Sequence, residues 1–105
     1  MKNETLEITE ETENGIFRLV LKGRIDSNTA DDFLSVLEDS LNKGQKFIIL
    51  NMSKVDYLSS IGIRIILKIY KQAAGAGGKL NIERPSAVVK NILGMTALND
   101  MMVTQ

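Results

Sequence analysis

Two adjacent serines, Ser59 and Ser60, are the side chains in this sequence whose position is best suited to chemistry. They follow an apolar run by one short segment and precede a nearly all-apolar stretch with the length of a helix. A serine in that place can accept hydrogen bonds from the free N–H groups of the first helical turn. It can also accept a phosphate, since the positive end of the helix dipole stabilises the added charge of about −1.5 to −2. The pair therefore indicates a helix cap or a modification site.

A catalytic role for these serines would need a base, and the sequence places none beside them. The chain has no His and no Cys, which removes imidazole bases, thiolate nucleophiles and zinc sites built from nitrogen and sulfur. The carboxylate pairs Asp31-Asp32 and Glu38-Asp39 fall in a predicted helix, where neighbouring side chains point in different directions, so we interpret them as a solvated face. We predict that the protein is not an enzyme and uses no metal and no cofactor.

The glycine-rich stretch from Gly75 to Lys79 has the composition of a phosphate loop but not its pattern. A Walker-type loop requires Gly-Lys followed by Ser or Thr, and it joins a strand to a helix. Here Ala73 stands at the position of the first glycine, Leu80 follows Lys79, and the stretch joins a predicted helix to a predicted strand. We interpret it as a helix terminus and a turn.

The elements that position the serines follow from the spacing of apolar residues. Alternation predicts strands over 5–10 and 16–22, and Asn14-Gly15 between them is typical of a tight hairpin. The polar cluster Asp26-Ser27-Asn28-Thr29 predicts the start of a helix that ends at Gly44. The continuous apolar run 47–52 predicts a central strand, covered on both faces and parallel to the second strand.

The second half of the chain is expected to continue the alternation of helices and strands. We predict a loop over 53–58, a helix over 61–74, a strand over 79–83 and a last helix that begins at Pro85-Ser86. The inward side of that helix is expected to contain Val88, Val89, Ile92 and Leu93. The apolar C-terminal residues are expected to cover the sheet, with a partner groove as the alternative; they are Met95, Leu98, Met101, Met102 and Val103.

In chain order these elements are β-β-α-β-α-β-α, which predicts an α/β domain with helices packed on a mixed, mostly parallel sheet. The 105 residues, of which 44% are hydrophobic, suit a single domain over 1–105 with one core. The 13 basic residues balance 13 acidic ones, so we expect no direct binding to nucleic acid or membrane. Without a bilayer-spanning run or a signal-peptide pattern, the chain is expected in the cytoplasm.

Three segments of the sequence resemble the STAS domain, the fold shared by bacterial anti-sigma factor antagonists and the cytoplasmic tails of some anion transporters. They are Leu21 to Asp26 with Thr29-Ala30, Ile49 to Leu58, and Ser59 to Arg64. Members of the family typically have a strand that ends in Asp-Leu-Ser, then Val and an aromatic residue, and then Asp-Ser-Ser/Ala-Gly-Leu at the start of the second helix. The resemblance spans nearly the whole chain.

The resemblance implies a partner-switching mechanism with Ser60 as the phosphorylated serine and Ser59 as the second choice. Unphosphorylated protein would bind a Bergerat-fold kinase that also acts as the anti-sigma factor, and a sigma factor would be released. Phosphorylation would end this complex, and a serine phosphatase would reset the switch. The implied partner-binding residues are Asp26, Ser27, Asn28, Thr29, Tyr57, Ser59, Ser60, Ile61, Gly62 and Arg64.

Three other interpretations stay open at this stage. Ser59 stands where the family commonly has Asp, and the bulky Ile61 stands where a small residue is usual. These two differences from the family pattern favour a STAS subunit that is never phosphorylated and that belongs to a transport or scaffold complex. The helix dipole near Ser60 would also suit a module that senses a nucleotide or another anion. In the simplest case, Ser59 and Ser60 only cap a core helix.

Overall fold

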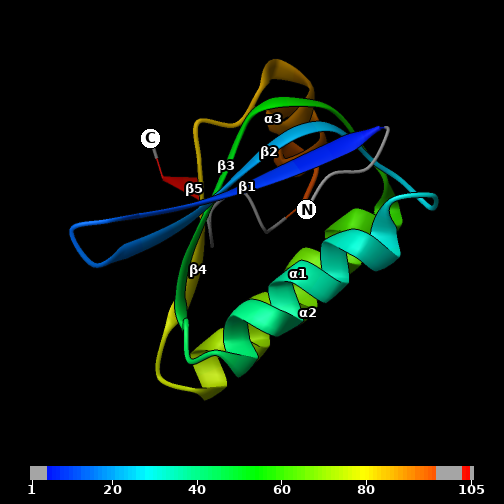
Figure 1. Ribbon diagram of the computed structural model, residues 1–105. Coiled ribbons are helices and arrows are strands. Elements are labelled where there is room, and N and C mark those ends of the chain that lie inside the picture. Colours follow the sequence, from blue (N-terminus) through cyan, green and yellow to red (C-terminus); the bar gives the residue numbers. More distant parts are fainter. Residues whose placement is uncertain (1–4, 97–102, 105) are drawn as a thin grey trace.

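Five strands form one sheet in the computed structural model, which describes residues 5–96 and 103–104 (Figure 1). The strands lie in the order β1-β2-β3-β4-β5; β1 and β2 are antiparallel, and every later pair is parallel. The elements are β1 (Leu6–Glu13), β2 (Ile16–Ile25), α1 (Ala30–Asn42), β3 (Phe47–Leu58), α2 (Ser60–Gly75), β4 (Lys79–Glu83), α3 (Ala87–Gly94) and β5 (Val103–Thr104). The predicted α/β class and element order are confirmed, and the two-residue β5 is an addition that we did not predict.

The turn between β1 and β2 has the geometry that its two residues favour. Asn14 has φ 53° and Gly15 has φ 80°, and positive φ at both positions is what the common two-residue hairpin turn requires. Glu13 pairs with Ile16 directly beside the turn. The predicted hairpin is therefore confirmed.

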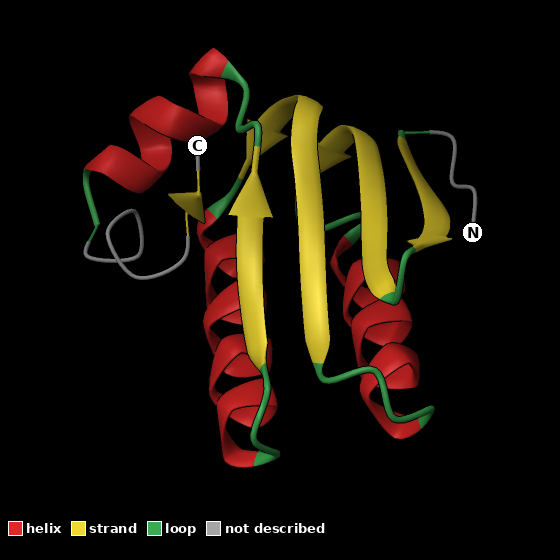
Figure 2. Ribbon diagram, turned by 90° about the vertical axis from the view of Figure 1, so that its left-hand side faces the viewer, coloured by secondary structure: helices red, strands yellow, loops and turns green. Residues whose placement is uncertain are grey.

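Helices α1 and α2 lie on one face of the sheet, behind the strands in Figure 2. Phe33 of α1 and Ile66 of α2 are fully buried there, together with alternate residues of the strands. Because side chains of a strand point to opposite faces in turn, one set faces the helices and the other does not. The strand residues buried in this core are Leu6, Ile8, Phe17, Leu19, Leu21, Ile25, Ile48, Leu50, Met52, Val55, Leu58, Leu80 and Ile82.

Strand β3 is central and parallel to β2, as predicted, but it is not covered equally on both faces. Ile48 and Leu50 are fully buried, whereas Phe47 is 60% exposed and Ile49 and Asn51 are half-buried. The expectation of full coverage was wrong because α1 and α2 both pack on the same face. The apolar residues at 47 and 49 therefore belong to the other side of the sheet.

The segment 53–58, predicted as a loop, is the second half of β3. It stays paired with β2 through Lys22↔Lys54, Gly23↔Val55, Arg24↔Tyr57 and Ile25↔Leu58, with two register shifts along the way. These irregularities place the buried residues Val55 and Leu58 three positions apart, which breaks the two-residue alternation used to predict strands. Their structural effect is that β2 and β3 end side by side.

Helix α3 begins after Pro85-Ser86, as predicted, and packs against β3. Val89 and Leu93, four residues apart on one helix face, are fully buried, and Ile92 is half-buried. Val88 is 38% exposed, so its predicted inward position was wrong. A helix of this length buries one face, and the residue before Val89 points about 100° away from it.

Of the apolar C-terminal residues, Met95 is the one whose side chain the structure describes. It is 81% exposed, so it does not cover the sheet. The remaining members, Leu98, Met101, Met102 and the side chain of Val103, lie outside the described residues. The prediction that these residues cover the sheet is therefore wrong for Met95 and is not tested for the others.

Candidate functional site

The carboxyl ends of β2 and β3 bring two segments of the candidate site together. The backbone N–H of Ser59 donates a hydrogen bond of 2.9 Å to the carbonyl oxygen of Ile25, and Ile25 is the register partner of Leu58. The loop that follows β2 and the start of α2 therefore meet at one edge of the sheet. Such edges of parallel strands are where side chains from distant segments converge.

Ser59 is the N-cap of α2. Its backbone is extended, with φ −84° and ψ 170°, and its Oγ accepts a hydrogen bond of 3.4 Å from the N–H of Gly62. This distance is longer than usual for an N–H···O bond, so the cap is weak. Ser59 is half-buried, and its hydroxyl has a structural role. The predicted cap is thus confirmed, and it is formed by the first serine of the pair.

Ser60, the first residue of α2, differs from Ser59 in both exposure and bonding. Its side chain is exposed, and within the described residues it takes part in no hydrogen bond that we find. The first turn of α2 contains no acidic residue, so the positive end of the helix dipole is not neutralised from within the helix. The exposed Arg64 lies one helical turn further on, on the same side. The Ser60 hydroxyl is therefore free, in an environment that favours negative charge.

Gly62 allows α2 to begin close to the ends of β2 and β3. A Cβ atom at this position would lie 2.7 Å from Ile25 Cγ2 and 2.7 Å from Leu58 Cδ1. Gly62 is buried, so it shapes the site from beneath and does not face a partner. A larger residue would force the helix or the side chains of Ile25 and Leu58 to shift.

The loop between β2 and α1 is held by its own side chains. Asp26 Oδ1 accepts a hydrogen bond of 2.9 Å from the N–H of Asn28. Thr29 Oγ1 donates to the Arg24 carbonyl oxygen at 2.9 Å and accepts from the Asp26 N–H at 3.0 Å. Thr29 is fully buried, so this predicted contact residue supports the loop. The exposed residues Ser27 and Asn28 are presented at its tip.

Arg24 joins the loop to Tyr57 and was missing from the residues predicted for the site. Its guanidinium lies 4.5 Å from the centre of the Tyr57 ring, and its Nε lies 3.4 Å from Asp26 Oδ2. A cation above an aromatic face is attracted to it. The sequence signal was the close spacing of Arg24, near the end of β2, and Asp26, directly after it. The pairing with Tyr57 required the register of β2 and β3, which the predicted loop at 53–58 concealed.

The exposed part of the site combines polar, aromatic and aliphatic side chains. Tyr57 is 39% exposed and Ile61 is 38% exposed, and apolar groups of this size commonly contribute to protein interfaces. We call these residues the Ser60 surface; they are Arg24, Ser27, Asn28, Tyr57, Ser60, Ile61 and Arg64.

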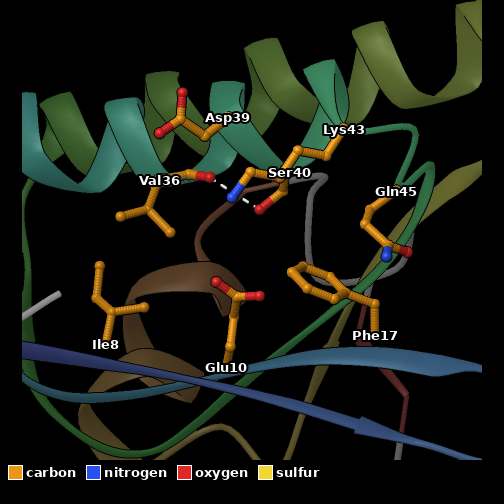
Figure 3. A pocket seen from close by; sticks show the side chains of 8 residues that line it. All are labelled: Ile8, Glu10, Phe17, Val36, Asp39, Ser40, Lys43 and Gln45. Carbon is orange, nitrogen blue, oxygen red and sulfur yellow. Dashed lines mark hydrogen bonds between the residues drawn. The ribbon is translucent and has the colours of Figure 1, made fainter.

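A cavity of about 220 Å³ lies elsewhere, between the β1–β2 hairpin and α1 (Figure 3). Its walls include the apolar Ile8, Phe17 and Val36, and Ser40 Oγ is occupied by a 2.8 Å hydrogen bond to the Val36 carbonyl oxygen. No residue of the Ser60 surface lines this cavity, so it gives no support to a nucleotide site at Ser60.

Over the described residues, no cluster of His, Cys, Asp or Glu could hold a metal ion, and no helix has the length and apolar character needed to cross a membrane.

Comparisons with known proteins agree with this fold. The model of the STAS domain family matches residues 7–105. The chain is 26% identical to an anti-sigma F factor antagonist of Paenibacillus polymyxa over 92% of this chain and 84% of that protein. It is 28% identical to BtrV of Bordetella bronchiseptica, named as an anti-sigma factor antagonist, over 71% of this chain but only 65% of that protein.

Two solved structures show the same fold at low sequence identity. An anti-sigma factor antagonist from Mycobacterium paratuberculosis superposes with a TM-score of 0.85 at 17% identity, over 94% of this chain and 85% of the other. The Bacillus cell fate determinant SpoIIAA in its phosphorylated form superposes with a TM-score of 0.73 at 16% identity, over 94% of this chain and 92% of the other.

Proposed function

The chain belongs to the STAS domain family, and from this premise we propose that it is an anti-sigma factor antagonist that phosphorylation of Ser60 switches off. In the unphosphorylated state it binds an anti-sigma factor, a serine kinase of the Bergerat fold, through the Ser60 surface, and the sigma factor is released. Phosphorylation by that kinase ends the complex, and a serine phosphatase restores the active form. The protein acts in the cytoplasm by binding and not by catalysis.

The observation that carries this proposal is the different use of the two serine hydroxyls. Ser59 Oγ accepts the capping hydrogen bond from Gly62 N–H at 3.4 Å, and the residue is half-buried. Ser60 is exposed, and its side chain makes no hydrogen bond that we find among the described residues. A kinase can therefore reach the Ser60 hydroxyl without breaking a contact of the fold. This supports Ser60 as the acceptor and makes Ser59 its structural support.

The same position explains how one phosphate can oppose binding without unfolding the protein. At the first residue of α2 the phosphate meets the positive end of the helix dipole, with Arg64 one turn away. In a complex, however, the dianion would lose its water beside the exposed apolar side chain of Ile61. Desolvating an unpaired charge at an interface is costly. The fold therefore persists while the affinity for the partner falls.

Ile61 favours a second candidate function, that of a STAS subunit which binds its partner permanently and is never phosphorylated. It directly follows the acceptor and is 38% exposed, so a bulky branched side chain stands beside the hydroxyl that a kinase would have to reach. Removing this side chain distinguishes the two functions. The variant Ile61→Ala should accelerate phosphorylation of a true substrate and should leave a constitutive subunit unphosphorylated.

The proposed switch is tested by measuring affinity for the kinase with matched serine variants. We expect Ser60→Asp to lose at least about tenfold in affinity, which corresponds to about 1.4 kcal/mol, and Ser60→Ala to bind like the unmodified protein. Ser59→Asp is a matched control, because the same charge is placed one residue earlier on a half-buried side chain. Far-UV circular dichroism confirms that each variant is folded. Wild-type affinity of a folded Ser60→Asp variant would contradict the proposal.

A further inference from the structure

The face of the sheet opposite α1 and α2 is not covered by those helices (Figure 2). Strand alternation places on it the residues of each strand that lie between the buried ones. The burial pattern identifies them in the central strands, because they are half-buried or exposed while their neighbours are buried. We call this set the open face; it consists of Glu7, Thr9, Glu11, Glu13, Ile16, Arg18, Val20, Lys22, Phe47, Ile49, Asn51, Lys79, Asn81 and Glu83.

The register of the strands arranges one row of the open face as acid, apolar, apolar, base. Glu13 pairs with Ile16, and Phe47 pairs with Lys79. Ile16 and Phe47 are neighbours, since the residues that follow them, Phe17 and Ile48, are register partners. The row across β1, β2, β3 and β4 therefore reads Glu13, Ile16, Phe47, Lys79.

The centre of this row is the most exposed apolar part of the open face. Phe47 is 60% exposed and Ile16 is 43% exposed, and Ile49, the next residue of β3 on this face, is half-buried. Contiguous apolar groups on a sheet face are a common feature of interaction sites. Two sheets that stack through such faces pack with their strands nearly aligned.

The next charges on the open face neutralise one another within the chain. Arg18 Nε lies 2.6 Å from Glu83 Oε2, and Arg18 Nη2 donates a second hydrogen bond of 3.2 Å to Glu83 Oε1. This bidentate pair reaches from β2 across β3 to β4 and raises the pKa of Arg18, chiefly through the hydrogen bond to Glu83. Glu7 and Lys22, which are register partners, also have opposite charges. The unbalanced charges are then acidic on β1, at Glu11 and Glu13, and basic on β4, at Lys79.

This distribution of charge selects one way of stacking two copies. A two-fold axis across the strands would place β1 of one copy over β1 of the other, acid against acid. An axis parallel to the strands places β1 of each copy over β4 of the other, acid against base, and the apolar centre over itself. Pairing along the free edge of β1 is disfavoured because that strand carries Glu7, Glu10, Glu11 and Glu13.

We propose that the open face binds a second copy of this chain across a two-fold axis parallel to the strands, so that Glu13 of each copy faces Lys79 of the other. The hairpin that carries Glu13 extends to the side of the sheet away from α1 and α2 (Figure 1), which is the direction this contact needs. Phe47 and Ser60 lie at opposite ends of the twelve-residue strand β3. Both copies therefore leave the Ser60 surface free and present it at the same end of the dimer.

The test is the mass of the full chain in solution, measured by sedimentation over a concentration series. We expect the mass to rise from 11.6 kDa toward twice that value as the concentration increases. Phe47→Glu should abolish this rise. Because Phe47 is exposed, the variant should fold like the unmodified protein, and circular dichroism checks this. A monomer at every concentration would overturn the proposal, as would a dimer that Phe47→Glu leaves intact.

Charge reversal tests the orientation of the two copies. Lys79→Glu and Glu13→Lys should each weaken the dimer, since like charges then face each other, and the double variant should restore it with the charges exchanged. Lys71→Glu, at an exposed position of α2 on the other side of the molecule, is the matched control and should change nothing. Two weakened single variants without recovery in the double variant would overturn the two-fold arrangement.

Discussion

Three serines beside helix starts differ in how their hydroxyls are used, and their replacement by alanine tests this assignment. Ser86 Oγ donates a hydrogen bond of 2.6 Å to the Val55 carbonyl oxygen and accepts one of 3.2 Å from the N–H of Val89. Ser59 Oγ accepts one hydrogen bond of 3.4 Å. Ser60 makes none that we find within the described residues. Stability should therefore fall most in Ser86→Ala, less in Ser59→Ala and least in Ser60→Ala.

The expected magnitudes follow from these contacts. Loss of an N-cap typically costs about 1 kcal/mol, and the long bond of Ser59 places its loss at about 0.5 kcal/mol. Ser86→Ala loses a shorter cap and also leaves the carbonyl of the buried Val55 without its partner, a further cost of about 1–2 kcal/mol. Its total is about 2–3 kcal/mol. Ser60→Ala should stay within about 0.5 kcal/mol of the unmodified protein.

Urea unfolding followed by far-UV circular dichroism measures all three differences, since a shift of the midpoint at constant slope reports the change in free energy of unfolding. The chain has no Trp, so secondary structure is the suitable signal. If Ser60→Ala lost clearly more than about 0.5 kcal/mol, the Ser60 hydroxyl would have a structural role. The reasoning that assigns Ser60 to phosphorylation and Ser59 to the cap would then be refuted.

Three further substitutions test the packing beneath the site, each by the same unfolding measurement. Gly62→Ala should lose about 1–2 kcal/mol, because its Cβ would lie 2.7 Å from Ile25 Cγ2; unchanged stability would show that the helix start is not tightly packed. Thr29→Val should lose about 2–3 kcal/mol, since the Arg24 carbonyl and the Asp26 N–H lose their shared partner, and a loss below that of Ser59→Ala would contradict this. Gly23→Ala should lose at least about 2 kcal/mol, because φ is +116° and its Cβ would overlap the Thr5 carbonyl oxygen; wild-type stability would mean that the strand moves freely here.

The parts of the fold that were predicted correctly depend on short-range patterns. The Asn14-Gly15 hairpin and the element order were recognisable because turn residues and apolar spacing act within a few positions. The second half of β3 was missed because its irregular register places Val55 and Leu58 three residues apart. Coverage of Phe47 could not be predicted either, since it depends on which face the helices occupy.

The candidate site was predictable as a location but not in the role of each residue. The sequence indicated that Ser59 and Ser60 stand at a helix start, yet the assignment of cap and free hydroxyl depends on where α2 begins, to within one residue. Thr29 and Gly62 were predicted as contact residues and are buried beneath the surface. Arg24 was missed because its contact with Tyr57 spans two strands.

The most direct test of the proposed switch is phosphopeptide mass spectrometry of the protein after incubation with ATP and the Bergerat-fold kinase of the same organism. We expect one phosphate on Ser60, its complete loss in Ser60→Ala and its retention in Ser59→Ala, because the cap hydroxyl is not the acceptor. Phosphate on Ser59, or no phosphate with a kinase that is active on another substrate, would contradict the central claim.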